Sequence, residues 1–125
     1  MGNKILVVDD EISALTLISI MLERGGYEVE KAKNAQSALT KLEGFTPSLV
    51  ILDVMMPGMD GIELCQILRQ RPPTHTMPIL ILSARNDAES IMKGIKAGAN
   101  DYLPKPIRNH DLVTKVRNMI QESVS

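Results

Sequence analysis

Three aspartates stand directly after short aliphatic runs of the sequence. Asp9 and Asp10 follow the run KILVV, and Asp53 follows the run LVIL. Carboxylates held close together repel one another, so such a cluster requires a bound cation or shifted pKa values. An all-oxygen site with few protein ligands suits Mg²⁺, which keeps several waters and often bridges to phosphate. The aspartates therefore predict a magnesium site, in which one carboxylate could accept a phosphoryl group as an aspartyl phosphate.

Two further polar residues hold comparable places. Ser83 follows the run ILIL, and Lys105 follows the segment Asp101–Pro104. Charge that develops on a phosphoryl group in transfer is stabilised by a metal, an ammonium and hydroxyl donors. We expect Asp10, Lys105 and Ser83 to supply that support to Asp53. Taken singly, each has an ordinary explanation as a helix cap, a solvated charge or a loop hydroxyl, so only their joint placement favours this chemistry.

The segments that must position these residues alternate between two patterns. The first pattern consists of short runs, of which the first, third and fourth are apolar on both faces, as parallel strands covered on both sides require. The other two runs are short and polar enough to be edge strands. The five predicted strands are Lys4–Val8, Glu28–Lys31, Leu49–Leu52, Ile79–Leu82 and Asp101–Pro104.

The second pattern consists of apolar residues at helical spacing. Asn34 is a predicted helix cap, Asp60 with Glu63 forms a predicted capping box, and glycines end the first and fourth helices. The segment RPPTHTMP predicts a surface loop. The predicted helical stripes run over Ile12–Leu22, Ala35–Leu42, Gly61–Arg69, Ala88–Ala97 (with Ile91, Met92 and Ile95) and Leu112–Ile120.

This alternation predicts an α/β fold, a doubly wound (βα)₅ domain with a five-stranded parallel sheet and helices on both faces. If the strand order is 2-1-3-4-5, the first, third, fourth and fifth strands are neighbours. Their carboxyl ends would then bring the three aspartates, Ser83 and Lys105 into one cleft, where open α/β sheets carry their sites. No linker or repeat interrupts the chain, so we expect a single domain over residues 1–125.

Composition excludes several other functions. A formal net charge of −1 and 2% aromatic residues argue against direct nucleic-acid binding by phosphate contacts or base stacking. Cys65 is the single cysteine, so an internal disulfide is impossible and a reduced setting is expected. No stretch has the form of a signal peptide or a membrane span. We therefore expect a soluble, cytoplasmic protein that does not associate with membranes.

Four segments resemble the receiver domain of two-component response regulators, and the resemblance extends over essentially the full length. They are ILVVDDE (Ile5–Glu11), LVILDVMMPGMDG (Leu49–Gly61), LILSA (Leu80–Ala84) and KAGANDYLPKP (Lys96–Pro106). The resemblance implies a flavodoxin-like fold and a phosphoacceptor, not an enzyme, that receives its phosphoryl group from a sensor histidine kinase or a histidine phosphotransfer protein. It also implies a downstream effector, whose identity the sequence leaves open.

The resemblance also implies roles for individual residues. Asp53 would be the acceptor; Asp10, Asp53 and the Met55 carbonyl would bind Mg²⁺, with Asp9 acting through water, and Mn²⁺ would be tolerated. Ser83 and Lys105 would contact the phosphoryl group, and the peptide bond before Pro106 would be cis. Tyr102 would be the switch aromatic that signals to the fourth helix, fifth strand and fifth helix. Met55 and Arg85 would flank the approach of the water that hydrolyses the phosphoryl group.

Departures from the family pattern bear on assembly. Ile91 and Lys96 stand where winged-helix members that dimerise through paired charges carry a basic and an acidic residue. We therefore expect a monomer or a weak dimer linked to phosphorylation.

Alternatives from other classes fit less well. A phosphatase of the haloacid dehalogenase type would need an aspartate two residues after Asp53, where this chain has Met55. A nucleotide- or flavin-binding module would want a glycine- or hydroxyl-rich loop after the first strand, where this chain has Asp9, Asp10 and Glu11. The nearest alternative is a degenerate receiver that binds partners without phosphorylation, and the complete set of five site residues argues against it.

Overall fold

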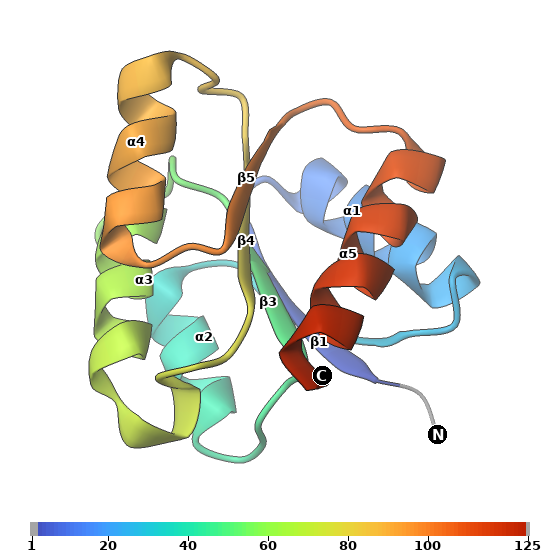
Figure 1. Ribbon diagram of the computed structural model, residues 1–125, viewed down its shortest axis with the longest axis horizontal. Coiled ribbons are helices and arrows are strands. Elements are labelled where there is room, and N and C mark those ends of the chain that lie inside the picture. Colours follow the sequence, from blue (N-terminus) through green and yellow to red (C-terminus); the bar gives the residue numbers. More distant parts are fainter. Residues whose placement is uncertain (1–2, 125) are drawn as a thin grey trace.

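The computed structural model, which describes residues 3–124, is a parallel sheet between two layers of helices (Figure 1). The five strands lie in the order β2-β1-β3-β4-β5, so the predicted fold class and strand order are confirmed. In chain order the elements are β1 (Lys4–Val8), α1 (Ile12–Arg24), β2 (Glu28–Ala32), α2 (Ala35–Leu42), β3 (Leu49–Leu52), α3 (Gly61–Gln70), the 3₁₀ helix η1 (Pro72–Thr74), β4 (Ile79–Ser83), α4 (Ala88–Ala97), β5 (Asp101–Pro104) and α5 (Asn109–Val124).

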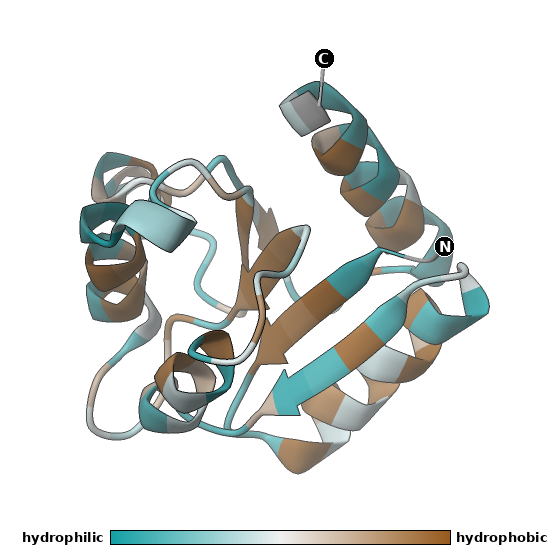
Figure 2. Ribbon diagram, turned by 90° about the horizontal axis from the view of Figure 1, so that it is seen from below, coloured by the Kyte–Doolittle hydropathy of each residue, from teal (hydrophilic) through white to brown (hydrophobic). Residues whose placement is uncertain are grey.

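Alternate residues of the three central strands face two separate cores. Helices α2, α3 and α4 cover one face of the sheet, and α1 and α5 cover the other (Figure 1). In β1, Leu6 and Val8 enter the first core, while Ile5 and Val7 enter the second. Figure 2 shows hydrophobic residues gathered on the strands and on the helix faces turned toward them. Burial on both sides explains why these strands carry continuous aliphatic runs.

Two predicted helical stripes differ from the structure. Ile12 is 60% exposed, so the buried stripe of α1 begins at Leu15 instead. On α4, Ile91 is half-buried against the core as predicted, but Met92 and Ile95 are exposed, and the buried residues are Gly94 and Ala97. Apolar spacing mispredicted this face because small residues let α4 lie close against the sheet.

The segment after α3 is more ordered than the predicted surface loop. It contains η1, and its residues Thr74 and Met77 are buried. The Thr74 hydroxyl donates a hydrogen bond of 2.5 Å to the Leu68 carbonyl at the end of α3. The predicted caps are confirmed: Asn34 accepts from the Ser37 amide, Asp60 and Glu63 form a capping box, and the helix α4 ends at a left-handed Gly98.

Arg69 forms a structural hub that the sequence did not predict. Its guanidinium donates hydrogen bonds to the Gly98 carbonyl at the end of α4 and to the Asn100 side chain before β5. It also donates to three carbonyls after α3, those of Thr74, His75 and Met77. Burial lowers the pKa of Arg69 below its ordinary value. The side chain therefore fixes α3 against the segments that lead into β4 and β5.

Candidate functional site

Four neighbouring strands end at the same edge of the sheet, and a cluster of polar side chains lies there. Asp9 and Asp10 follow β1, and Asp53 follows β3. One oxygen of each of these three carboxylates lies within 4.8 Å of the others. The strand β4 is one residue longer than predicted, so Ser83 is its last residue instead of the residue that follows it. Lys105 follows β5. The three aspartates therefore lie together as predicted, and Ser83 and Lys105 lie at the same edge of the sheet.

Lys105 holds the cluster together from the β5 side. Its Nζ lies 2.5 Å from Asp9 Oδ2 and 3.2 Å from Asp53 Oδ2. Asp9 is 1% exposed and Asp53 is 8% exposed, so both carboxylates depend on protein partners for charge compensation. The other oxygen of Asp9 accepts a hydrogen bond of 3.0 Å from the Glu11 amide.

The pKa values of Asp53 and Lys105 both depart from their ordinary values. Burial raises the pKa of Asp53 and the Asp9 charge raises it further, although Lys105 acts in the opposite direction. Burial alone would lower the pKa of Lys105, but its hydrogen bond to Asp9 and the attraction of both carboxylates raise it. Burial and the neighbouring Asp9 charge therefore disfavour the ionised form of Asp53, despite its ion pair with Lys105.

We predict that Asp53→Asn raises the free energy of unfolding of the metal-free protein at neutral pH by about 1 kcal/mol, because it removes a disfavoured charge. A raised carboxyl pKa costs stability above the folded-state pKa, and the cost disappears as the pH falls below the ordinary value of 3.8. The gain should therefore shrink on acidification. Thermal unfolding followed by circular dichroism between pH 7 and pH 4 measures it, and a mutant less stable than wild type at pH 7 contradicts the prediction.

Ser83 and Tyr102 meet at the backbone of one residue. The buried Ser83 Oγ accepts a hydrogen bond of 3.2 Å from the Arg85 amide, and the Tyr102 hydroxyl donates to the Arg85 carbonyl. Tyr102 is buried under α4, where a Cβ at Gly94 would lie 2.9 Å from the ring. Any movement of the Ser83–Arg85 segment is thereby connected to the packing of Tyr102.

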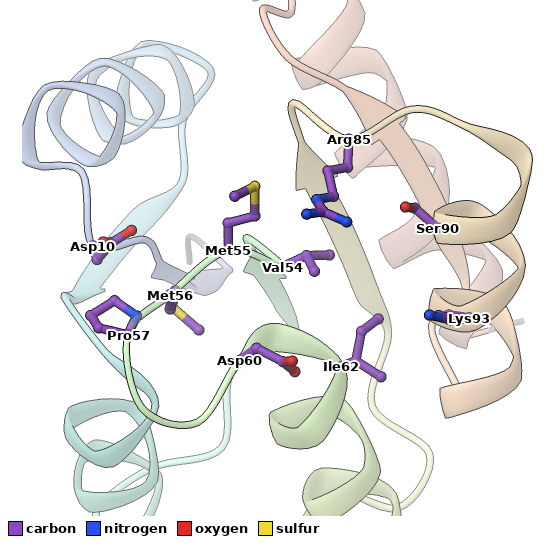
Figure 3. Close-up of a pocket in the computed structure, with 10 residues that line it drawn as sticks. All are labelled: Asp10, Val54, Met55, Met56, Pro57, Asp60, Ile62, Arg85, Ser90 and Lys93. Atoms are coloured by element: carbon purple, nitrogen blue, oxygen red, sulfur yellow. The ribbon is translucent and has the colours of Figure 1, made fainter.

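A pocket of about 490 Å³ opens beside the carboxylates (Figure 3). Asp10, Met55, Arg85 and Lys93 are among the residues that line it. The Met55 amide donates a long hydrogen bond of 3.4 Å to Asp53 Oδ1. Figure 3 shows the Met55 and Arg85 side chains among the residues that line this pocket.

Two features of the backbone shape the same region. The Lys105–Pro106 peptide bond is cis, and the Lys105 amide donates a hydrogen bond of 2.9 Å to the Ser83 carbonyl. Gly61, at the start of α3, lies so close to Asp53 that a Cβ would be 2.1 Å from the Asp53 carbonyl oxygen. Sequence reasoning placed Gly61 only as a helix start and missed this contact.

Comparison with known proteins places the chain in a family. Residues 5–117 match the family model of the response regulator receiver domain. The alkaline phosphatase synthesis transcriptional regulatory protein PhoP of Bacillus subtilis is 42% identical over 98% of this chain and 50% of its own length. The DNA-binding response regulator MtrA of Mycobacterium tuberculosis is 36% identical over 98% of this chain and 53% of its own length. The chain belongs to the receiver domains of two-component response regulators.

A solved structure agrees with this assignment. The chemotaxis response regulator CheY4 of Vibrio cholerae superposes with a TM-score of 0.90 and 33% identity, over 95% of this chain and 99% of that one. The chain spans about half the length of the curated relatives named above. Within residues 3–124, no helix is both long and apolar enough to cross a bilayer.

Proposed function

We propose that Asp53 accepts one phosphoryl group in a Mg²⁺-dependent reaction, with a sensor histidine kinase or a histidine phosphotransfer protein as the donor. The observation that carries this proposal is the position of the Asp53 carboxylate, which directly follows a buried strand and lies beside two more carboxylates and one ammonium. This receiver domain, proposed to occupy residues 1–125, would be a phosphoacceptor that assists its own phosphorylation and dephosphorylation and catalyses no other reaction.

The donor set fits a hard divalent cation. The three carboxylates and the Lys105 ammonium together carry a net charge of −2 when all four groups are ionised. Asp10, Asp53 and the Met55 carbonyl would hold Mg²⁺ directly and Asp9 would act through water, because oxygen ligands suit Mg²⁺ and equally Mn²⁺. When bound, the ion neutralises charge on the phosphoryl oxygens.

The chain's own residues perform the transfer. An Asp53 carboxylate oxygen attacks phosphorus, and a P–O bond forms as the bond from phosphorus to the donor's histidine nitrogen breaks. The Lys105 ammonium, already 3.2 Å from Asp53 Oδ2, is placed to bind the incoming phosphoryl oxygens. The Ser83 hydroxyl supplies a second donor from β4.

The test is the mass of the protein after incubation with Mg²⁺ and acetyl phosphate. Wild type should gain one phosphoryl group that is lost in base, and Asp53→Asn should gain none, because an amide is not a nucleophile for this reaction. Chelation of the metal should prevent the gain in wild type. A wild-type protein that remains unmodified would instead support the degenerate, phosphorylation-independent receiver.

Phosphorylation would be transmitted through the Ser83–Arg85–Tyr102 contacts. Movement of Ser83 toward the phosphoryl group would change the packing of Tyr102 and so alter the surface of α4, β5 and α5. That surface would bind the downstream effector. The described residues carry no feature that calls for direct nucleic-acid contact, and we propose a monomer or a weak dimer linked to phosphorylation.

Met55 and Arg85 are proposed to set the lifetime of the phosphorylated state. The Met55 thioether is a weak hydrogen-bond acceptor, and the Arg85 guanidinium can shield phosphoryl oxygens, so neither orients a hydrolytic water. We predict that Met55→Asn combined with Arg85→Glu speeds phosphoryl loss by about tenfold. This rate corresponds to an activation barrier that is lower by roughly 1.4 kcal/mol, because the attacking water is better positioned. A time course after donor removal at fixed Mg²⁺ measures it, and an unchanged rate excludes this role.

A further inference from the structure

We propose that Met55 is a site of reversible oxidation, through which a peroxide shortens the lifetime of the phosphorylated domain. This inference rests on the proposed function of Asp53. Of the methionines in the described residues, Met55 is 53% exposed and Met92 is 55% exposed. The others are buried or half-buried: Met21, Met56, Met59, Met77 and Met119. Exposure decides which thioethers an oxidant in solution can reach.

The two exposed methionines differ in where they lie. Met92 is on α4, outside the residues that line the site pocket. Met55 lines that pocket together with Asp10 and Arg85 (Figure 3). The Met55 amide also donates a hydrogen bond of 3.4 Å to Asp53 Oδ1. An altered Met55 side chain is therefore placed to affect chemistry at Asp53, whereas an altered Met92 side chain is not.

The oxidation step is a transfer of one oxygen atom. The Met55 sulfur donates an electron pair to one oxygen of the peroxide as the O–O bond breaks. With hydrogen peroxide, that oxygen becomes the S=O group and the other leaves as water. The thioether is oxidised by two electrons and the peroxide is reduced by two. Methionine sulfoxide reductases reverse this modification, so the change can act as a signal and not only as damage.

The sulfoxide changes what Met55 can do for a water molecule. A thioether accepts hydrogen bonds weakly, whereas the S=O oxygen is a polar acceptor. Hydrolysis requires a water oxygen to attack phosphorus as the bond from phosphorus to the Asp53 oxygen breaks, which releases inorganic phosphate. Asp53 lies against the buried Asp9 and the Lys105 ammonium, while Asp10 and Met55 line the open pocket beside it, so we infer that water approaches from this pocket. One added hydrogen bond to that water corresponds to about a threefold to tenfold faster loss.

The experiment compares wild type, Met55→Leu and Met92→Leu, each with itself before and after treatment with dilute hydrogen peroxide. Peptide mass spectrometry first measures sulfoxide at each methionine, which is independent of phosphorylation. Each protein is then phosphorylated with acetyl phosphate and Mg²⁺, the donor is removed, and phosphoprotein loss is followed. We expect sulfoxide at Met55 and Met92, faster loss after peroxide in wild type and Met92→Leu, and no peroxide effect in Met55→Leu. Methionine sulfoxide reductase should restore the slow rate.

Two results would overturn the inference while leaving the proposed function intact. One is an unoxidised Met55 under conditions that oxidise Met92, and the other is an oxidised Met55 with an unchanged rate of phosphoryl loss. A peroxide effect that persists in Met55→Leu also overturns it, because another residue is then responsible. Failure of untreated wild type to take up a phosphoryl group overturns the proposed function and this inference together.

Discussion

Lys105→Met is expected to lower the free energy of unfolding of the metal-free protein by about 3 kcal/mol, because it leaves two buried carboxylates without their cation. Lys105 is the ion-pair partner of both Asp9 and Asp53, and its side chain is 18% exposed. Methionine keeps much of the length of the lysine side chain, so the loss reports charge more than packing. Urea titration followed by circular dichroism in the presence of a chelator measures the change.

Lys115→Met is the matched control for this prediction. Lys115 pairs with Asp101 at 2.5 Å, but the two side chains are 34% and 37% exposed. Exposed pairs contribute little, so the control should lose less than about 1 kcal/mol. Added Mg²⁺ should recover part of the stability of Lys105→Met, since a cation that binds only the folded state stabilises it. If Lys105→Met and Lys115→Met lowered the free energy of unfolding equally, burial of the Lys105 ion pairs would not be the reason for the expected loss of stability.

The fold was predictable because its signals are local. Aliphatic runs such as Leu49–Leu52 are buried on both faces, and their alternation with helical stripes admits few topologies. The site followed from the same reasoning, since parallel strands end at one edge of the sheet. Asp9, Asp53 and Lys105 lie within ion-pair distance although they are far apart in the sequence.

The rest could not be predicted because it depends on distances between segments. Arg69 has the sequence pattern of a solvated helix cation, yet its guanidinium is held by carbonyls that only the folded chain brings together. The apolar spacing of α4 favours burial of Met92, but close approach through Gly94 determines which face packs. Likewise, no sequence pattern reveals that Lys105 lies closer to Asp9 than to Asp53.

Gly61→Ala is expected to lower the free energy of unfolding by about 3 kcal/mol, at the upper end of overpacking effects. The added methyl would lie 2.1 Å from the Asp53 carbonyl oxygen and 2.9 Å from the Val54 Cα. Both are backbone atoms, so no side-chain rotation can relieve the contact. Either α3 or the backbone of Asp53 and Val54 must move. The Gly61 amide, which donates to the Val54 carbonyl at 3.0 Å, would be displaced with them. Urea titration measures the loss.

Gly44→Ala separates this steric effect from the general effect of replacing a glycine. At Gly44 the nearest atom to an added Cβ is the Lys41 carbonyl oxygen at 3.7 Å, an ordinary contact, so stability should change by less than about 1 kcal/mol. Because the strain at Gly61 falls on Asp53, the proposed acceptor, Gly61→Ala should also slow phosphorylation by acetyl phosphate, and Gly44→Ala should not. A Gly61→Ala protein with wild-type stability would mean that α3 can withdraw from Asp53 at little cost. The close approach at Gly61 would then have no part in positioning the acceptor.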